Sequence, residues 1–379
     1  MLWVTGKAPR EINHFQGKKP MRKLASIATI ATAEPIPEAD RLDVVTLEGK
    51  AWRIVTGRNE FRPGDRAVYF EIDSALPADD ERFAFLHDRC LRTWSDKHGN
   101  ALKQAVRIRT VKLKGVISQG LVIPVSAFPE LADRNVGDDV TGDLRVEHFD
   151  EISEQMRAAL DTRGPQGFGR REGNFPAWIP KTDEERIQNL ADWPDRLKGV
   201  LWEVTEKKDG SSMTVFWSPE NRPDNPFGVC SRNFELKRDE TNAWWEMAIK
   251  HGLEEKLRGL GREIALQGEL VGPGMNGNRD LLSERSFRVF RIWDIANQCY
   301  VPSGERVELC KKLGIPHVPV IAAAMDVFSE LPDVDAVLKF AEGVTENGHE
   351  REGLVFKEAN TAYPRSFKAV SNRYLLKLK

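Results

Sequence analysis

The chain has 379 residues, of which 40% are hydrophobic and 30% are charged, and its formal net charge is -2. This is a globular composition, and the length suffices for two domains of ordinary size. The near-neutral balance excludes nucleic-acid binding through overall charge, so any such contact must come from local basic patches.

The cysteines are few and scattered. Cys90, Cys230, Cys299 and Cys310 form no CxxC pair, so they predict neither a disulfide framework nor a zinc site. They are typical of reduced thiols, and we expect a cytoplasmic location. No apolar run approaches the roughly 20 residues of a membrane helix, and we identify no signal peptide.

Residues 1–20 are polar and are treated as an extension, and the pattern that follows over residues 21–150 is one of short strands. Turn residues such as Arg62-Pro63-Gly64-Asp65 separate the apolar runs. The predicted strands are Leu24–Ala33, Leu42–Leu47, Ala51–Val55, Ala67–Ile72, Val106–Lys114 and Gly120–Pro124. They predict a small Greek-key β-barrel of the OB type, and an unspecified β-barrel fits the pattern equally well.

Four basic residues fall on the predicted strand Val106–Lys114. Arg107, Arg109, Lys112 and Lys114 are interleaved with aliphatic side chains. A strand with one basic and one apolar face suits contact with a phosphate backbone, and we predict that these four bind nucleic acid. A solvated edge strand kept soluble by its charges is the alternative.

Residues 151–175 predict a short helix over 151–160 and a Gly-rich linker, and residues 176–379 predict an α+β domain. Its predicted strands are Trp202–Thr205, Ser212–Trp217, Gly228–Cys230, Ile264–Leu270, Phe287–Ile295 and Gly353–Lys357. Its predicted helices are Asn242–Leu257, Ser303–Leu313 and Val334–Ala341.

Chemically active side chains lie in or just after these predicted strands. In chain order, the segments are Lys207-Lys208-Asp209-Gly210, Ser231-Arg232-Asn233, Gln267-Gly268-Glu269-Leu270, Phe290 with Trp293-Asp294, Glu352-Gly353-Leu354-Val355-Phe356-Lys357 and Ser366-Phe367-Lys368. The ordered set resembles the covalent nucleotidyltransferase superfamily, which comprises ATP-dependent DNA and RNA ligases and mRNA capping enzymes. That resemblance implies antiparallel, ATP-grasp-like sheets with helices.

Further residues narrow the resemblance. Ser212 stands where DNA ligases usually carry an arginine, and the segment from Lys181 to Asn189 is similar to the one that precedes the nucleophile in RNA-joining ligases. With an OB-like region ahead of the transferase region, nearly the whole chain resembles the DraRnl-like RNA ligases. This implies an ATP-dependent RNA ligase that seals 5′-phosphate and 3′-OH ends, as a monomer, at nicks in RNA or RNA/DNA duplexes.

The resemblance also implies roles for individual residues. Lys207 would be the nucleophile, since the neighbouring Lys208 has the wrong spacing to Asp209 and points away by strand alternation. Lys357, Lys368 and a bound Mg²⁺ or Mn²⁺ would lower the pKa of Lys207 and stabilise charge on the α-phosphate. Asp209 and Glu352 would hold the metal, through waters. The implied ATP-binding residues are Arg186, Glu206, Arg232, Asn233, Glu269, Phe290, Lys357 and Lys368.

Several residue roles and the function itself have alternatives that the sequence leaves open. Phe290 also fits a core aromatic, and Arg186 also fits a surface arginine. The family's last motif usually carries two lysines at i and i+2, but Lys368 is flanked at that spacing by Ser366 and Val370, which leaves Arg365 or Lys377 as a second cation. A DNA ligase, a GTP-using capping enzyme and a non-catalytic nucleic-acid-binding protein are the rival functions.

Overall fold

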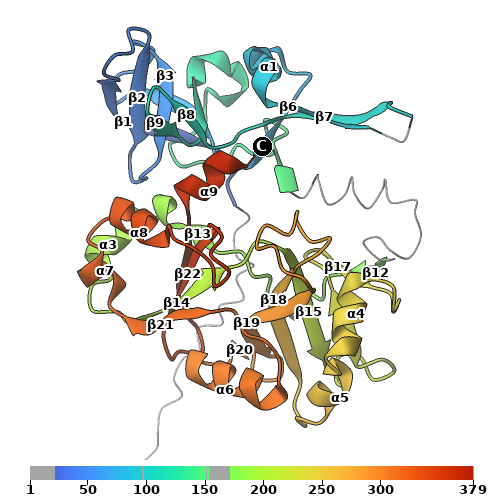
Figure 1. Cartoon of the computed structure of the whole chain (residues 1–379). Coiled ribbons are helices and arrows are strands. Elements are labelled where there is room, and N and C mark those ends of the chain that lie inside the picture. The colour runs from blue at the N-terminus through green and yellow to red at the C-terminus, as the bar shows by residue number, and fades with distance from the viewer. Residues whose placement is uncertain (1–21, 96–97, 151, 153–170, 379) are drawn as a thin grey trace, which may run out of the picture.

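The computed structural model describes residues 22–95, 98–150, 152 and 171–378. The predicted extension, the linker at residues 163–169 and the predicted helix over residues 151–160 lie outside this range, apart from residue 152. An N-terminal β-barrel lies above a larger C-terminal region built on two sheets (Figure 1). No helix in the described part of the chain is long and apolar enough to cross a membrane.

Two sheets and a hairpin form the barrel, which confirms the predicted OB-type fold. The first sheet has the order β10-β4-β1-β2-β3, with β1 (Ala25–Pro35), β2 (Leu42–Leu47), β3 (Arg53–Gly57), β4 (Arg66–Phe70) and β10 (Leu121–Pro124). The second has the order β11-β5-β7-β6, with β5 (Ser74–Pro77), β6 (Leu91–Ser95), β7 (Ala101–Arg107) and β11 (Glu147–His148). The hairpin pairs β8 (Val111–Leu113) with β9 (Val116–Ser118), and short helical turns are η1 (Glu81–Leu86), α1 (His87–Cys90), η2 (Val125–Ala127) and η3 (Pro129–Leu131).

Strand β1 closes the barrel by pairing with two neighbours. Its first half pairs with β4 and its second half with β2, and the register shifts between Ile30 and Thr32. Such a bulge bends a strand and increases its twist, which lets one strand turn a barrel corner. The enclosed core includes Trp52, Phe70 and Phe128.

The predicted single strand Val106–Lys114 is wrong. β7 ends at Arg107, and β8 begins at Val111 in a different sheet. Ile108 instead exchanges backbone hydrogen bonds with the turn at Asp73 and Ser74, which takes the chain out of the β7 ladder. Ile108 is itself buried, so the alternation of apolar and polar residues continues across the break between the two strands. The sequence pattern therefore does not indicate where β7 ends.

The C-terminal region contains a seven-stranded sheet in the order β12-β17-β16-β15-β18-β19-β20 and a five-stranded sheet in the order β13-β23-β22-β14-β21. Strands of the first are β12 (Arg171–Asn174), β15 (Ser211–Trp217), β16 (Phe227–Cys230), β17 (Phe234–Leu236), β18 (Ile264–Val271), β19 (Ser286–Asp294) and β20 (Cys299–Tyr300). Strands of the second are β13 (Glu185–Arg186), β14 (Trp202–Lys207), β21 (Val320–Met325), β22 (Gly353–Glu358) and β23 (Ser366–Val370). All pairs are antiparallel except β13 with β23.

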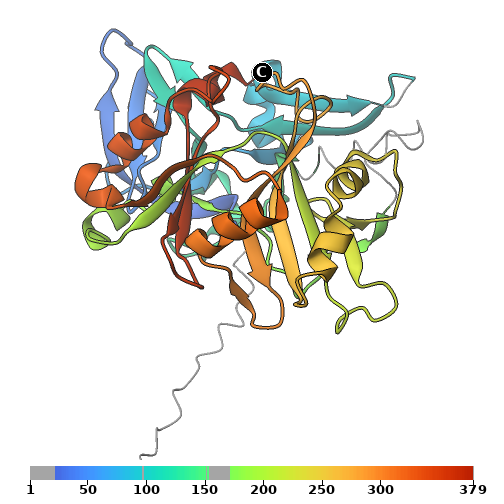
Figure 2. The same cartoon turned by 60° about the horizontal axis from the view of Figure 1, so that its bottom comes forward.

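Helices cover the outer faces of both sheets (Figures 1 and 2). They are η4 (Ile187–Asn189), α3 (Trp193–Arg196), α4 (Ala243–Lys250), α5 (Leu253–Arg258), α6 (Ser303–Leu313), α7 (Val327–Glu330) and α8 (Val334–Ala341), while α9 (Asn372–Lys377) packs against the barrel. The predicted helix Asn242–Leu257 is two helices, because Gly252 adopts a left-handed φ of 59° between α4 and α5. α6 and α8 match their predicted bounds.

The last helix joins the two parts of the chain. Val370, Tyr374 and Leu375 belong to the buried core of the N-terminal barrel, although they follow the last strand of the C-terminal region. In Figure 1, α9 lies directly beneath the barrel. The barrel core is therefore completed by residues about 220 positions beyond its own last strand, since β11 ends at His148 and α9 begins at Asn372.

Candidate active site

Strand alternation gives the five-stranded sheet one apolar and one polar face. Trp202, Val204, Phe356 and Phe367 pack with α7 and α8 in a buried cluster on one face. Successive side chains of a strand point to opposite faces, and paired residues share a face. The other face carries Val355 and a polar set made of Glu203, Thr205, Lys207, Lys357, Ser366 and Lys368.

Lys207 ends β14 and pairs with a carboxylate of the neighbouring strand. Its Nζ lies 2.7 Å from Glu352 Oε1. Burial favours a lower pKa for Lys207, but the charges of Glu352 and Glu269 outweigh it and raise the pKa above its ordinary value. Lys207 is therefore an ammonium in the ligand-free site, and the lowering of its pKa by a bound metal ion stays a prediction.

Two carboxyl groups beside Lys207 repel each other. Glu269 lies on β18, and burial raises its pKa to about 8, with Lys207 opposing and Glu352 adding to the rise. Burial likewise raises the pKa of Glu352, whose Oε2 is buried and has no hydrogen-bond partner among the described residues. Adding a cation relieves such crowding of carboxylates, so this side-chain set fits a hard divalent metal ion.

Asp209 is held by three side chains. Its Oδ1 accepts a hydrogen bond from Asn276, and its Oδ2 accepts one from the Tyr374 hydroxyl and lies 3.4 Å from Arg279 Nε. Within the described ranges, no group of three or more acidic, histidine or cysteine side chains is arranged to hold a metal directly. Asp209 and Glu352 therefore stay predicted as metal ligands through waters.

The neighbouring Lys208 points away from Lys207, as predicted. Its buried Nζ lies 2.6 Å from Glu206 Oε1 and 3.2 Å from Asp280 Oδ2. Glu206, predicted to bind ATP, thus uses its carboxylate on Lys208. Gly210 follows at a place where a Cβ atom would come within 2.3 Å of the Leu270 carbonyl oxygen, so only glycine fits there.

Two predicted ATP-binding residues lie against Asp183, and a third pairs with one of them. Lys368 Nζ lies 2.9 Å from Asp183 Oδ1, and Arg232 Nη2 lies 3.9 Å from Asp183 Oδ2. Arg186 pairs with Lys368 across β13 and β23. Burial, aided by Arg186, lowers the pKa of Lys368 although Asp183 opposes it. Asn233 accepts a hydrogen bond from Lys181 at 2.7 Å.

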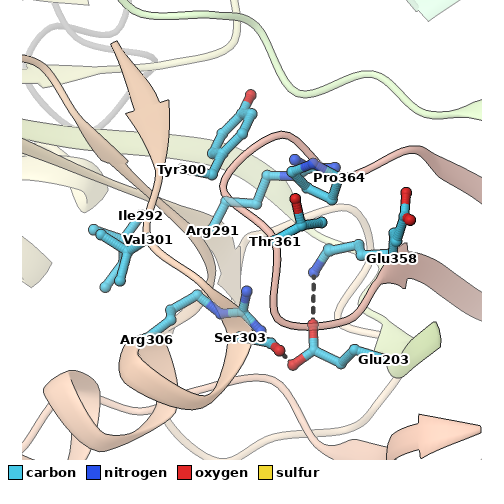
Figure 3. Close-up of a pocket in the computed structure, with 11 residues that line it drawn as sticks. Glu203, Arg291, Ile292, Tyr300, Val301, Ser303, Arg306, Glu358, Thr361 and Pro364 are labelled. Atoms are coloured by element: carbon cyan, nitrogen blue, oxygen red, sulfur yellow. Dashed lines mark hydrogen bonds and ion pairs between the residues drawn. The ribbon is translucent and has the colours of Figure 1, made fainter. Parts of the chain in front are cut away.

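Lys357 lies further along the same face and contacts Phe290, which belongs to β19 of the seven-stranded sheet. The register of β18 and β19 shifts so that Phe290 is an extra, bulged residue, half-buried rather than a core aromatic. Lys357 Nζ donates to the Phe290 carbonyl at 2.9 Å and lies 3.8 Å from Glu203 Oε2. Glu203 also pairs with Arg306, at the edge of a small pocket (Figure 3).

This placement corrects the predicted role of Lys357 as a neighbour that lowers the pKa of Lys207. The charges that act most strongly on Lys207 are those of Glu352, Glu269 and Asp209. Lys357 itself has its pKa lowered to about 7 by burial and by Arg306, with Glu203 opposing. It is a buried lysine near the far end of the polar face.

Each alternative for the second cation of the last motif is held by a carboxylate of its own. Arg365 Nε pairs with Glu358 at 2.9 Å, and Lys377 pairs with Glu350. Lys357 is the residue directly opposite Ser366 in the β22–β23 register, and the Ser366 hydroxyl bonds to Glu184, which pairs with Arg291.

The four predicted nucleic-acid-binding residues do not share one face. The Arg107 guanidinium lies 4.2 Å from the centre of the Phe149 ring, and Arg109 Nη1 donates to the Leu378 carbonyl at 3.4 Å. Lys112 and Lys114 are exposed on the β8–β9 hairpin, where Lys114 has a left-handed φ of 46°.

Several residues that hold the site carry no signal in the sequence. Asp73 binds Arg186, Asp183 binds Lys368, Glu203 binds Lys357, and Tyr374 binds Asp209. Asp73 comes from the barrel and Tyr374 from the last helix, so no spacing along the chain relates them to Lys207. Asp183 lies in the segment from Lys181 to Asn189, but a charged residue in a run of charged residues does not by itself indicate a functional role.

Comparison with known proteins agrees with this geometry. Residues 200–379 match the RNA ligase family model, and residues 24–125 match an OB-fold domain model. No curated protein sequence matches the chain.

Solved structures of a Naegleria gruberi RNA ligase are similar over nearly the whole chain. An apo mutant is 37% identical, with a TM-score of 0.79, and the match covers 94% of this chain and 98% of that one. A mutant with ATP and Mn is 37% identical, and the form with PPi is 38% identical, each with a TM-score of 0.79 and coverage of 94% and 99%. With this identity over this length, the chain belongs to the RNA ligase family.

Proposed function

We propose that the protein joins RNA ends at the expense of ATP and that Lys207 is its nucleophile. The observation that carries this proposal is the position of Lys207, which ends β14 on the polar face with its Nζ 2.7 Å from Glu352. The similar Naegleria gruberi ligase has structures with ATP and Mn, with AMP and Mn, and with PPi, which supports ATP as the nucleotide.

The reaction would run in three displacements at phosphorus. The neutral Lys207 amine attacks the α-phosphorus of ATP, the bond to pyrophosphate breaks, and lysyl-AMP forms with loss of one amine proton. An oxygen of a 5′-phosphate end then takes the AMP from Lys207, giving an AppN end. Finally a 3′-OH attacks the phosphorus of that end, and AMP leaves.

The carboxylates around Lys207 set the requirement for the first step. They hold Lys207 as an ammonium, which is not nucleophilic, so the local field must change before attack. A bound Mg²⁺ or Mn²⁺ supplies positive charge that offsets the carboxylates and the polyphosphate. Asp209 and Glu352 would hold it, and Glu352 Oε2 is the buried acceptor without a partner among the described residues.

We assign the remaining nucleotide contacts by position on the polar face of the five-stranded sheet and on the neighbouring strands of the seven-stranded sheet. Glu269, close to Lys207, would accept a ribose hydroxyl, with Arg232 and Asn233 beside the sugar or phosphate. Phe290 would stack on adenine, since its ring stands on a half-exposed bulge. Lys368 and Arg186 would bind phosphates, and Glu206 would support the nucleotide site from behind through its pairing with Lys208.

Adduct formation tests the nucleophile. Incubated with labelled ATP and Mn²⁺, the wild type should retain label on one lysine, and peptide mapping should place it on Lys207 and not on Lys208. Lys207→Met should abolish the adduct, while Lys198→Met, which removes an exposed lysine of the same region, should leave it unchanged.

Other outcomes of this experiment favour the rival functions. An adduct with GTP but not with ATP would establish a capping-type guanylyltransferase. Absence of any adduct from folded wild type, with both nucleotides and both metals, would favour a non-catalytic nucleic-acid-binding protein.

We further infer that the substrate is a nick in a duplex with RNA on the 3′-OH side. The N-terminal OB barrel, a fold that commonly binds nucleic acid, and the exposed Lys112 and Lys114 support contact with a nucleic acid. The nick and the RNA on the 3′-OH side follow from the resemblance to the DraRnl-like RNA ligases. Sealing should be compared for one nick built with RNA or DNA on each side in turn. Faster sealing with RNA on the 3′-OH side is expected, and equal rates on all four nicks would contradict it and favour a general ligase.

We also propose that the protein acts as a monomer in the cytoplasm. Its four cysteines are all free thiols in the structure, in keeping with a reducing compartment. Light scattering of the purified protein at working concentration would test the monomeric state.

A further inference from the structure

Arg186 lies on the polar face of the site, and only one nitrogen of its guanidinium has a hydrogen-bond partner among the described residues. It is 6% exposed, and its Nη2 donates to Asp73 Oδ2 at 2.8 Å. Its Nε and Nη1 are buried and have no hydrogen-bond partner in the described part of the chain. A buried guanidinium donor left without a partner costs free energy, so such donors are normally satisfied by an anion.

Asp73, the partner of Arg186, belongs to the N-terminal barrel. It stands between β4 and β5 with a left-handed φ of 71°, a conformation that aspartate tolerates better than most residues. Its backbone N–H donates to the Ile108 carbonyl at 2.8 Å, and its own carbonyl accepts from the Phe149 N–H at 2.9 Å. These two backbone hydrogen bonds fix the turn that carries the Asp73 carboxylate.

Charge around Asp73 keeps it ionised. Burial favours a higher pKa for Asp73, but Arg186 and Arg22 outweigh this and hold the pKa well below its ordinary value. Arg22 Nη1 lies 3.7 Å from Asp73 Oδ2, and Arg22 is itself anchored by Glu71 at 2.8 Å. Asp73 also offsets the positive charge that Arg186 places next to Lys368, its partner across β13 and β23.

We propose that Asp73 is a positioning residue for adenylylation: it holds Arg186 through Nη2 so that the N–H groups at Nε and Nη1 point at the phosphate groups of ATP that leave as pyrophosphate. This inference rests on the proposed function, and it deepens it by giving the barrel a defined contribution to the first step. Arg186 pairs with Lys368 and shares Asp73 with Arg22, so the Asp73 carboxylate offsets the mutual repulsion of these cations.

The test separates the steps of the reaction. Asp73→Asn keeps the shape of the side chain and removes its charge. We expect the KM for ATP in lysyl-AMP formation to rise about tenfold, as for loss of one charge-assisted hydrogen bond. Sealing of a nick whose 5′ end already carries AMP should change less than twofold, because that reaction does not use the polyphosphate. Asp79→Asn removes an exposed barrel aspartate paired with Arg145 and should behave as wild type in both assays.

A double variant distinguishes positioning from a general loss of structure. If Asp73 acts through Arg186, then Asp73→Asn adds little to the defect of Arg186→Ala. Multiplicative defects would overturn the proposal, as would an unchanged KM for ATP in Asp73→Asn. Equal losses in ATP-dependent and pre-adenylylated sealing, with a lower melting temperature, would reduce Asp73 to a structural role. If wild type forms no lysyl-AMP, the proposed function fails. If wild type forms lysyl-AMP and Asp73→Asn leaves the KM for ATP unchanged, the inference alone fails.

Discussion

Two lysines on the same sheet face have opposite pKa shifts, and their neighbours explain the difference. Lys207 is half-buried and lies beside Glu352 and Glu269, which raise its pKa. Lys357 is buried, and burial and Arg306 lower its pKa to about 7 in spite of Glu203. Burial alone lowers the pKa of a lysine, so the sign of the result depends on how many carboxylates stand close to the amine.

The lowered pKa of Lys357 predicts a particular pH dependence of stability. Below pH 7, Lys357 is charged in both folded and unfolded chains, and the cost of burying that charge is fully present. Between pH 7 and about 10, the folded state loses this proton before the unfolded state does, so stability rises with pH. The gain should approach about 1.4 kcal/mol per pH unit at most.

Urea unfolding of wild type and Lys357→Met at several pH values measures this contribution. The free energy of unfolding of wild type relative to the variant should rise from pH 7 to pH 10. Lys339→Met, which removes a lysine with an 81% exposed side chain, should show a difference that stays flat across the same range. A difference between wild type and Lys357→Met that stays flat or falls would show that Lys357 is charged in the fold.

At the scale of the element, periodicity predicted most strands that carry the site. β14, β15, β18, β19 and β22 fall within two residues of the predicted bounds. Each of these strands is a continuous apolar run or an alternating run that ends at a glycine or a charged residue. The local sequence pattern therefore predicts the same strands as those in the structure. The motif residues lie in these strands or directly beside them, and the fold brings Lys207, Glu269 and Glu352 together.

Elements whose boundaries depend on distant contacts could not be predicted. β13 has two residues and forms by parallel pairing with β23, about 180 residues later in the chain. The break between β7 and β8 depends on the turn at Asp73, and the bulge at Phe290 depends on the approach of β18. At Gly268 of β18 a Cβ atom would come within 2.4 Å of the Arg288 carbonyl oxygen. No local pattern encodes these long-range contacts.

At the scale of the whole molecule, the barrel and the C-terminal region share residues that bear on the site. Asp73 extends from the barrel to Arg186, and α9 extends from the C-terminal region into the barrel core. Tyr374 of α9 connects the two, because its ring is buried and its hydroxyl donates to Asp209. The packing of the barrel and the geometry of the site are thereby coupled through one short helix.

This coupling predicts that a substitution in the barrel core affects adenylylation. Leu375 is 7% exposed and lies next to Tyr374, so Leu375→Ala should lower the free energy of unfolding by about 2 kcal/mol, as for a buried leucine. It should also slow lysyl-AMP formation under conditions where the protein is folded, because Tyr374 is displaced from Asp209. Leu376→Ala, in the same helix but 36% exposed, should change stability by less than about 0.5 kcal/mol and leave the adduct rate unchanged. Urea unfolding and a time course with labelled ATP measure the two effects; a stability loss in Leu375→Ala without any slowing of adduct formation would contradict the coupling.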